Sequence, residues 1–377
     1  METNRNELTE YVYSLYDRGL MSDYSNNHFL IKAMKGELTY LYFQNNPYLG
    51  NRIITNISGM DFSSTFICNF SIKMHYLSSI FVNKDKFEDF IKNQLAAGKE
   101  NYSEDQFFQA ISEINVLQYL SLYSGKLKEA FYEPELCDDT NPEARFHFEN
   151  GMIFDIEVKT ANFGEVLEDK IKRSQDKDFL IKLNFVMSEE SKQSLKEYCD
   201  EKNIELFFPR VLKLKDFIES AGKKFEEITD EKHFNLLFIN WTYIDYMEWR
   251  LNEPTFLLTN PISALLYNEN VQEIIGIDKK SLDKISAIVL YRDNIDTLLS
   301  QDFRYHFAHQ TFKLILNENL KSINNFSLLC KALGMNPYDA ESEAISYAEC
   351  VKCGASTDNQ NANNALEFAL KLWQKNS

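Results

Sequence analysis

The sequence predicts an α/β (α+β) protein in which a mixed central sheet is flanked by helices. Three observations lead to this class. Apolar residues with a period of two on both sides of Asn150-Gly151 predict an antiparallel hairpin. Two apolar segments, 179–187 and 235–241, enclose a stretch with helical character, which is the alternation that builds an α/β sheet. From residue 317 onward, apolar residues recur at helical spacing.

The length and composition predict a folded chain with additions to one central domain. The 377 residues exceed what one ordinary core holds. Apolar residues make up 44% of the chain, and with only 12 Gly and 7 Pro long disordered linkers are not expected. We expect an N-terminal mixed α/β region over 1–99, a central core over 100–316 and a C-terminal helical region over 317–377.

Targeting and redox signals favour a cytoplasmic protein. No apolar run reaches the roughly 20 residues that span a bilayer, and the polar first ten residues lack a signal-peptide core. We therefore expect no membrane association. Cys350 and Cys353 have metal-ligand spacing, but no second ligand pair lies nearby, so no zinc site is predicted. The excess of Lys over Arg and the abundance of Asn and Ile suggest an AT-rich, bacterial genome.

The N-terminal region reads as helix, strands and helix in that order. Apolar residues at helical spacing predict a helix within 6–20. Aromatic and β-branched content predicts strands at 37–43 and 63–74. A helical period returns in 81–98 and ends at Gly98.

The central region begins with a capped helix. Ser103 and Gln106 fit a capping box, and apolar residues then continue at helical spacing to Leu120. Strands are predicted within 128–136 and 285–291, and a helix at about 188–202.

The hairpin Ala144–Glu149 and Met152–Thr160 combines a structural signal with a chemical one. Asn150-Gly151 is the pair best able to form a tight type I′ turn. The period of two places Asp155, Glu157 and Lys159 on one strand face and apolar residues on the other. Buried carboxylates need a compensating cation.

A divalent metal ion would supply that cation. Glu143 precedes the first strand and lies across the turn from the end of the second, so its carboxylate could meet that of Glu157. Oxygen ligands of this kind suit Mg²⁺ or Mn²⁺.

Pro142-Glu143, the hairpin and Glu157-Val158-Lys159 together resemble the PD-(D/E)xK nuclease superfamily, with Glu in place of the commoner first Asp. The resemblance implies a restriction-endonuclease-like core, with Glu143, Glu157 and the Val158 carbonyl as metal ligands. It also implies that Lys159 positions the attacking water, and that Glu113 on the preceding helix is an outer ligand or base. The subfamily cannot be assigned.

Two features of this region leave alternatives open. Asp155 shares the face of Glu157, and pairing with Arg145 across the hairpin is as compatible with the pattern as metal contact. In the helix expected at about 164–177, Lys170, Arg173 and Lys177 fall on one face. That face either contacts substrate phosphates or is solvated.

The resemblance implies a metal-dependent enzyme that hydrolyses phosphodiester bonds, with DNA favoured over RNA. By analogy alone, such bacterial proteins are often restriction or phage-defence effectors. The net charge of −17 predicts modest affinity with strong salt dependence, or recruitment of the nucleic acid through a protein partner. A homo-oligomer is also compatible with the sequence.

Two other interpretations compete with this one. The chain could be a catalytically inactive scaffold that retains the nuclease fold, which the acidic charge and the Glu for Asp replacement favour. It could also be an unrelated α/β protein in which Glu143, Glu157 and Lys159 form a surface ion-pair network worth little.

Overall fold

The computed structural model describes residues 10–15, 17–21, 28–39, 62–95, 103–136, 140–161, 179–182, 189–207, 211–241, 251–259, 265–292, 312–321 and 323–339. Its strands are β1 (Leu127–Tyr132), β2 (Ala144–Phe148), β3 (Ile153–Thr160), β4 (Phe179–Lys182), β5 (Ile204–Phe207), β6 (His233–Asn240), β7 (Ala287–Tyr291) and β8 (Lys313–Leu316). Its helices include α2 (Phe29–Met34), α4 (Phe62–Ile80), α5 (Lys84–Asn93), α6 (Glu104–Tyr123), α8 (Glu189–Glu201) and α9 (Val211–Lys224). They continue with α10 (Asn252–Thr259), α11 (Glu269–Ile275), α12 (Lys279–Leu282), the 3₁₀ turn η1 (Glu318–Leu320) and α14 (Phe326–Leu333).

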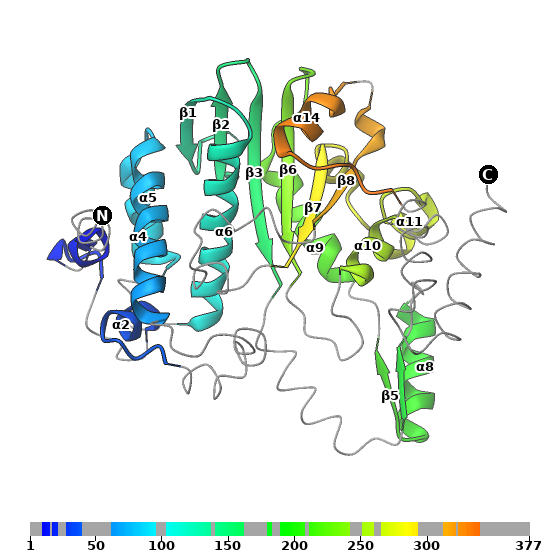
Figure 1. Cartoon of the computed structure of the whole chain (residues 1–377). Coiled ribbons are helices and arrows are strands. Elements are labelled where there is room, and N and C mark those ends of the chain that lie inside the picture. Colours follow the sequence, from blue (N-terminus) through cyan, green and yellow to red (C-terminus); the bar gives the residue numbers. More distant parts are fainter. Residues whose placement is uncertain are drawn as a thin grey trace, which may run out of the picture.

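Six strands form one mixed sheet in the order β1-β2-β3-β6-β7-β8 (Figure 1). The first three strands are antiparallel, β6 runs parallel to β3, β7 runs parallel to β6, and β8 is antiparallel to β7. The mixed α/β class expected from the sequence is confirmed.

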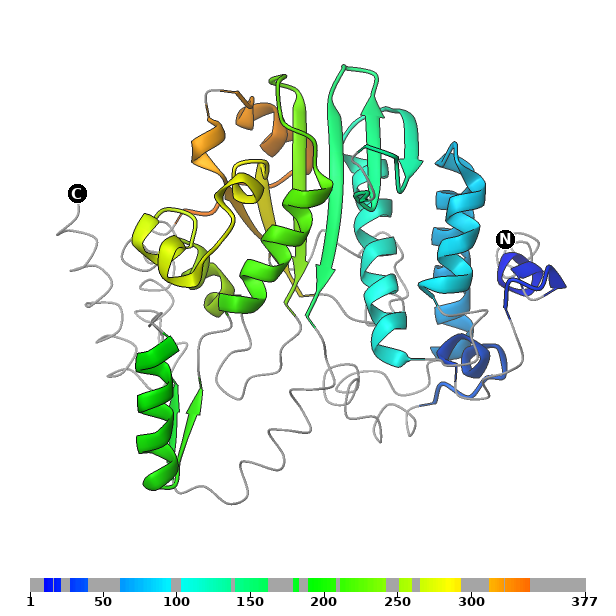
Figure 2. The same ribbon diagram turned by 180° about the vertical axis from the view of Figure 1, so that it is seen from behind.

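Different helices cover the two faces of this sheet. Phe154 and Ile156 point to the face covered by α6, which α4 packs against, and they join one large hydrophobic cluster. Leu237 and Ile239 of β6 point to the opposite face, where they belong to a second cluster with α9. In the β3–β6 pairing, Leu237 is the partner of Glu157. Figure 2 shows α9 lying across the sheet beside β6. On β3 the residues that share the α9 face are Asp155 and Glu157.

The β2–β3 hairpin is present, but its turn is not of type I′. Gly151 has a φ of 81°, whereas Asn150 is absent from the described residues with positive φ. The Gly151 amide donates to the Phe148 carbonyl at 3.0 Å, and the Phe148 amide donates to the Met152 carbonyl at 2.9 Å. This is a three-residue loop closed by a left-handed glycine, the next most common hairpin connection. The register expected for the strands is unaffected.

The strand predicted at 63–74 is wrong, because this segment lies within the helix α4. Buried residues of α4 recur every four positions, so they form one helical stripe, which includes Phe62, Phe66, Phe70 and Met74. Phe66 contacts Phe29 of α2 and Phe107 of α6. Aromatic and β-branched composition suggested a strand, but the helical period determines the structure.

The other N-terminal elements follow the expectations where the structure describes them. Residues 10–15 are helical, and α5 lies within the helix predicted over 81–98. Ser103 caps α6 by accepting a hydrogen bond from the Gln106 amide at 3.4 Å. Most of the strand expected at 37–43 lies outside the described residues.

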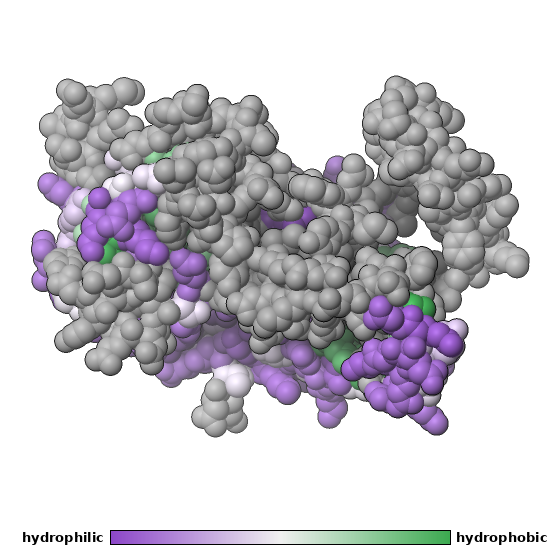
Figure 3. All heavy atoms as spheres, turned by 90° about the horizontal axis from the view of Figure 1, so that it is seen from below, coloured by the Kyte–Doolittle hydropathy of each residue, from purple (hydrophilic) through white to green (hydrophobic). Residues whose placement is uncertain are grey.

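The expectation that segment 179–187 joins the central sheet is wrong for the part that is described. β4 pairs in parallel with β5 in a separate two-stranded sheet. The helix predicted between the two apolar segments is confirmed as α8, and β6 takes the central place expected for 235–241. α8 carries mostly exposed polar side chains and forms a hydrophilic surface in the view from below (Figure 3). Local apolar content cannot distinguish a strand of the central sheet from one of a small outlying sheet.

The large hydrophobic cluster draws residues from all three predicted regions. Leu15 from the N-terminal region, Phe154 from the sheet and Leu329 from α14 all belong to it. The boundaries near residues 100 and 317 stay predictions. None of the described helices is long and apolar enough to cross a membrane.

Candidate functional site

The hairpin places two pairs of charged residues next to each other on its α9 face. Arg145 of β2 lies opposite Asp155 of β3, and Ala144 lies opposite Ile156. Glu143 immediately precedes β2, and its carboxylate shares the Lys224 ammonium with that of Glu157 on β3. One pair therefore has opposite charges and the neighbouring pair has like charges.

Glu157 is the most deeply buried residue of the like-charged pair, with a fully buried side chain. Its Oε1 lies 2.5 Å from the Lys159 ammonium and 2.7 Å from the Lys224 ammonium. Its Oε2 has no hydrogen-bond partner among the described residues. A buried carboxylate oxygen without a hydrogen bond destabilises the fold unless another group, such as a bound ion or water, contacts it.

Glu143 shares the Lys224 ammonium with Glu157, at 3.4 Å from its Oε1. Burial raises the pKa of Glu143, and the neighbouring Glu157 charge raises it further. Lys224 and Lys159 offset only part of this effect, and the pKa of Glu143 is about 7. The two lysine charges equal the two carboxylate charges in number, but they do not offset the effect of burial on Glu143.

Lys224 comes from the last turn of α9, which the sheet face and α12 hold in place. A Cβ on Gly222 would lie 2.4 Å from backbone atoms of Ser281, so the close approach of α9 to α12 requires glycine at this position. Burial alone would lower the pKa of Lys224, but the Glu143 and Glu157 carboxylates raise it above its ordinary value. The ammonium therefore stays charged between them.

Glu113 approaches the site from α6, and its side chain is buried. The Tyr132 hydroxyl of β1 donates a hydrogen bond to its Oε1 at 3.0 Å. Burial raises the pKa of Glu113 well above its usual range, and the Glu143 and Glu157 charges add to the effect, while the Tyr132 hydrogen bond opposes it. Burial therefore disfavours the charged form of Glu113 at this position.

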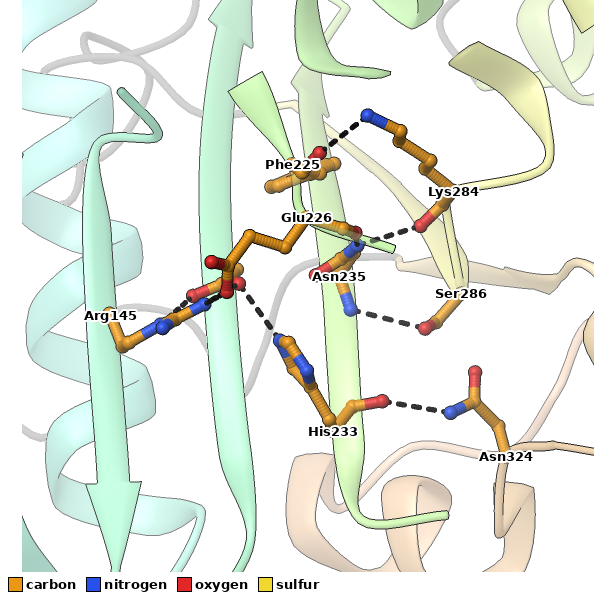
Figure 4. Close-up of polar contacts among 9 residues, drawn as sticks. Arg145, Phe225, Glu226, His233, Asn235, Lys284, Ser286 and Asn324 are labelled. Carbon is orange, nitrogen blue, oxygen red and sulfur yellow. Dashed lines mark hydrogen bonds and ion pairs between the residues drawn. The ribbon is translucent and has the colours of Figure 1, made fainter. Parts of the chain in front are cut away.

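The neighbouring pair, Arg145 and Asp155, belongs to a polar network that includes His233 and Glu226 (Figure 4). Arg145 donates to both Asp155 oxygens at 2.6 Å, and His233 Nε2 lies 2.9 Å from Asp155 Oδ2. Arg145 also donates to Glu226 at 2.5 Å. Burial would raise the pKa of Asp155, but these hydrogen bonds outweigh burial and lower it. Of the two alternatives for Asp155, the pair with Arg145 is present, and metal contact stays untested.

The same network extends to the first residues of β6. The Asn235 amide donates to the backbone carbonyls of Glu226 and Lys284 at 2.8 and 2.9 Å. Asn324 donates to the carbonyl of His233 at 2.8 Å. These bonds join β6 to the segments after α9, before β7 and before α14, so this region is a structural junction.

The structure thus brings together Glu143, Glu157 and Lys159 among the residues expected to form the site. Val158 lies in β3 opposite Phe238, and the role of its carbonyl as a ligand stays a prediction. Three basic residues expected to contact substrate, Lys170, Arg173 and Lys177, lie outside the described residues. Cys350 and Cys353 lie outside them as well.

Two residues of the site were not anticipated, Lys224 and Tyr132. A signal for Lys224 exists in the sequence. The buried residues of α9 include Leu214, Phe217 and Ala221, and a residue three positions after Ala221 falls on that same stripe. A lysine on the apolar stripe of a helix indicates a buried charge partner. Tyr132 carries no comparable signal in a chain with 20 tyrosines.

The donor set fits a hard divalent cation of the Mg²⁺ type. Among the described residues, no group of three or more His, Cys, Asp or Glu side chains could hold a metal ion. Mg²⁺ does not require such a group, since it usually retains several waters and uses one or two carboxylates. The unsatisfied Oε2 of buried Glu157 is the atom that such an ion or its waters would complete.

No family model, curated protein or solved structure matches this chain.

Proposed function

We propose that the chain is a metal-dependent nuclease with a restriction-endonuclease-like core of the PD-(D/E)xK type. The observation that carries the proposal is the convergence of Glu143 and Glu157 on one cationic atom, with Lys159 in contact with Glu157. The order α6, β1, β2, β3 is the helix, strand and hairpin order that the resemblance implies. The parallel strand β6 then continues the sheet beside β3.

Each site residue has a role that its surroundings support. Glu143 and Glu157 would hold Mg²⁺ or Mn²⁺, which when bound polarises a scissile phosphate and stabilises the leaving oxygen. Lys159 is about one-fifth exposed, so its ammonium can contact both Glu157 and an attacking water. The hydrogen bond that Glu113 accepts from Tyr132 supports a hydrogen-bonding role outside the ligand set.

The burial of the cluster argues against a surface ion-pair network. Glu157 is fully buried, and the side chains of Glu143, Lys159 and Lys224 are each less than one-quarter exposed. Such a cluster is costly to retain for stability alone, because replacing buried ion pairs by apolar residues is often neutral or stabilising. A functional site explains its presence more simply.

The competing function is a non-catalytic scaffold with the same fold. The observation that favours it is that Lys224 already compensates both carboxylates without a metal ion. A scaffold predicts no cleavage under any metal condition.

The test is cleavage of DNA and RNA by purified protein with Mg²⁺, Mn²⁺ or EDTA. We expect metal-dependent cleavage that falls by at least about 10²-fold in Glu157→Gln and in Lys159→Met, since each change removes a group acting on the reacting atoms. Glu149→Gln and Lys126→Met are matched controls, because these residues form an exposed ion pair beside the hairpin turn. Cleavage that persists in both site variants would contradict the assignment.

A further inference from the structure

A lysine ammonium lies where the proposed site needs a cation. Lys224 Nζ is 2.7 Å from Glu157 Oε1 and 3.4 Å from Glu143 Oε1. Lys159 contacts the same oxygen of Glu157, so two positive charges face two carboxylates. The charge of the cluster is therefore balanced by the protein alone.

The balance of charge leaves the hydrogen bonding incomplete. Glu157 is fully buried, and its Oε2 has no hydrogen-bond partner in the described part of the chain. The ammonium nitrogen also stands farther from both carboxylates than the roughly 2.1 Å of a Mg²⁺–oxygen bond. A divalent ion with its waters would satisfy more of these oxygens at shorter distance.

The side chain of Lys224 is suited to leaving this position. Its backbone is fixed, because Gly222 holds α9 directly against Ser281. Its side chain is 23% exposed and carries the ammonium on a flexible four-carbon stem. The ammonium can therefore rotate toward solvent while the helix stays in place.

We propose that the Lys224 ammonium holds the place of the divalent cation between Glu143 and Glu157, and that entry of the metal ion displaces it. This inference rests on the metal site of the proposed function. Lys224 then competes with the metal ion for the two carboxylates. The protein can fold without the ion, and the ion binds more weakly than it would if Lys224 were absent.

The first measurement is Mn²⁺ binding at pH 8.5, followed by the electron paramagnetic resonance signal of the free ion. This pH lies above the pKa of about 7 of Glu143. Lys224→Met and Lys224→Gln remove the competing charge, and we expect both to bind Mn²⁺ about tenfold more tightly than the wild type or more, a gain of about 1.4 kcal/mol. Lys223→Met changes the net charge equally at an exposed neighbouring position and should leave the affinity unchanged.

The second measurement is thermal unfolding with EDTA and with saturating Mg²⁺. Without metal, Lys224→Met should unfold at a lower temperature than the wild type, because two buried carboxylates lose a shared partner. Mg²⁺ should close that gap, whereas Lys223→Met should show no gap. If the methionine variant does not fold, the glutamine variant, which retains donors to Glu157, replaces it in both measurements.

The outcomes separate this inference from the nuclease proposal. Equal or weaker Mn²⁺ binding by the Lys224 variants, or no binding by any variant, would overturn the displacement of Lys224 whether or not the protein cleaves nucleic acid. Tighter binding by the Lys224 variants supports it even if the wild type cleaves nothing. Addition of Glu157→Gln to Lys224→Gln should abolish the gain, and a gain that survives this change would place the ion elsewhere and overturn the inference.

Discussion

Two pairs of charged residues lie next to each other at the β2–β3 hairpin and differ in the sign of their charges. Arg145 and Asp155 are opposite in charge, and their hydrogen bonds are satisfied by each other, by His233 and by Glu226. Glu143 and Glu157 have like charges and depend on lysines from outside the pair. The first pair lowers the pKa of its carboxyl, whereas the second raises that of Glu143.

This difference indicates which pair stabilises the fold and which pair could be stabilised further by a bound cation. A satisfied buried pair gains little from any added ligand. The like-charged pair has its charges matched by lysines, but one buried oxygen of Glu157 has no hydrogen-bond partner among the described residues, so a bound ion could still stabilise it. On β3, Asp155 therefore belongs to the structural junction, and Glu157, two residues further along, belongs to the candidate site.

The largest stability effect is expected from breaking the opposite-charged pair. Asp155→Asn leaves the Arg145 guanidinium without its bidentate partner, and we expect a loss of about 3–5 kcal/mol in the free energy of unfolding. Because the pKa of Asp155 is lowered in the folded state, its contribution is present at neutral pH and is lost as the pH falls through the lowered pKa. Urea unfolding at pH 7 and at successively lower pH values measures both effects.

The matched control for this change is Glu226→Gln. Glu226 contacts the same guanidinium, but its side chain is 41% exposed, so we expect a loss of at most about 1 kcal/mol. If the two variants lose equal stability, the burial of Asp155 does not set the strength of this pair.

The next effect has the opposite sign. Glu143→Gln removes one of the two like charges, and in metal-free protein we expect it to stabilise the fold by up to about 3 kcal/mol at pH 8.5. The pKa of Glu143 rises from 4.5 to about 7 on folding. The wild type therefore keeps its full stability below pH 4.5 and loses this part of it as the pH rises through 7, whereas glutamine does not titrate.

Thermal unfolding of both proteins in EDTA from pH 5 to pH 8.5 checks this prediction. The two curves should come together towards pH 4.5, separate progressively between pH 4.5 and 7, and stay a constant distance apart above pH 7. A variant that is less stable than the wild type at pH 8.5 would show that the pair is already compensated by the protein.

The smallest effect concerns the link between the sheet and α6. Tyr132→Phe removes the hydrogen bond to Glu113, and we expect a loss of about 1 kcal/mol. The same change should raise the pKa of Glu113 further, since that bond favours the charged carboxylate. Calorimetric unfolding measures the first effect, and carboxyl titration by NMR the second. Tyr123→Phe, an exposed position on the same helix as Glu113, should change neither quantity.

Local patterns predicted the hairpin and the face on which its charged residues lie, because both depend on short-range spacing. A period of two fixed which residues share the face of Glu157. The turn type was wrong because Gly151 alone adopts a positive φ. The strand at 63–74 was wrong because composition was weighed above the recurrence of Phe66, Phe70 and Met74 every four residues.

The remaining errors concern contacts between distant segments. Lys224 lies 67 residues after Glu157 in the chain, and only the packing of α9 on the sheet brings them together. The separate pairing of β4 with β5 likewise depends on a tertiary arrangement that apolar content does not encode. Sequence spacing predicts which side chains lie on one face of a helix or strand, but not which other helix or strand packs against that face.

The central claim is that the like-charged pair is a divalent cation site, and crystals soaked in Mn²⁺ test it most directly. We predict an anomalous difference peak between Glu143 and Glu157 at the roughly 2.1 Å typical of octahedral oxygen coordination, with the Lys224 ammonium moved away from both carboxylates. Crystals with no peak at this position at saturating Mn²⁺, and with Lys224 still in contact with Glu157, would contradict the account.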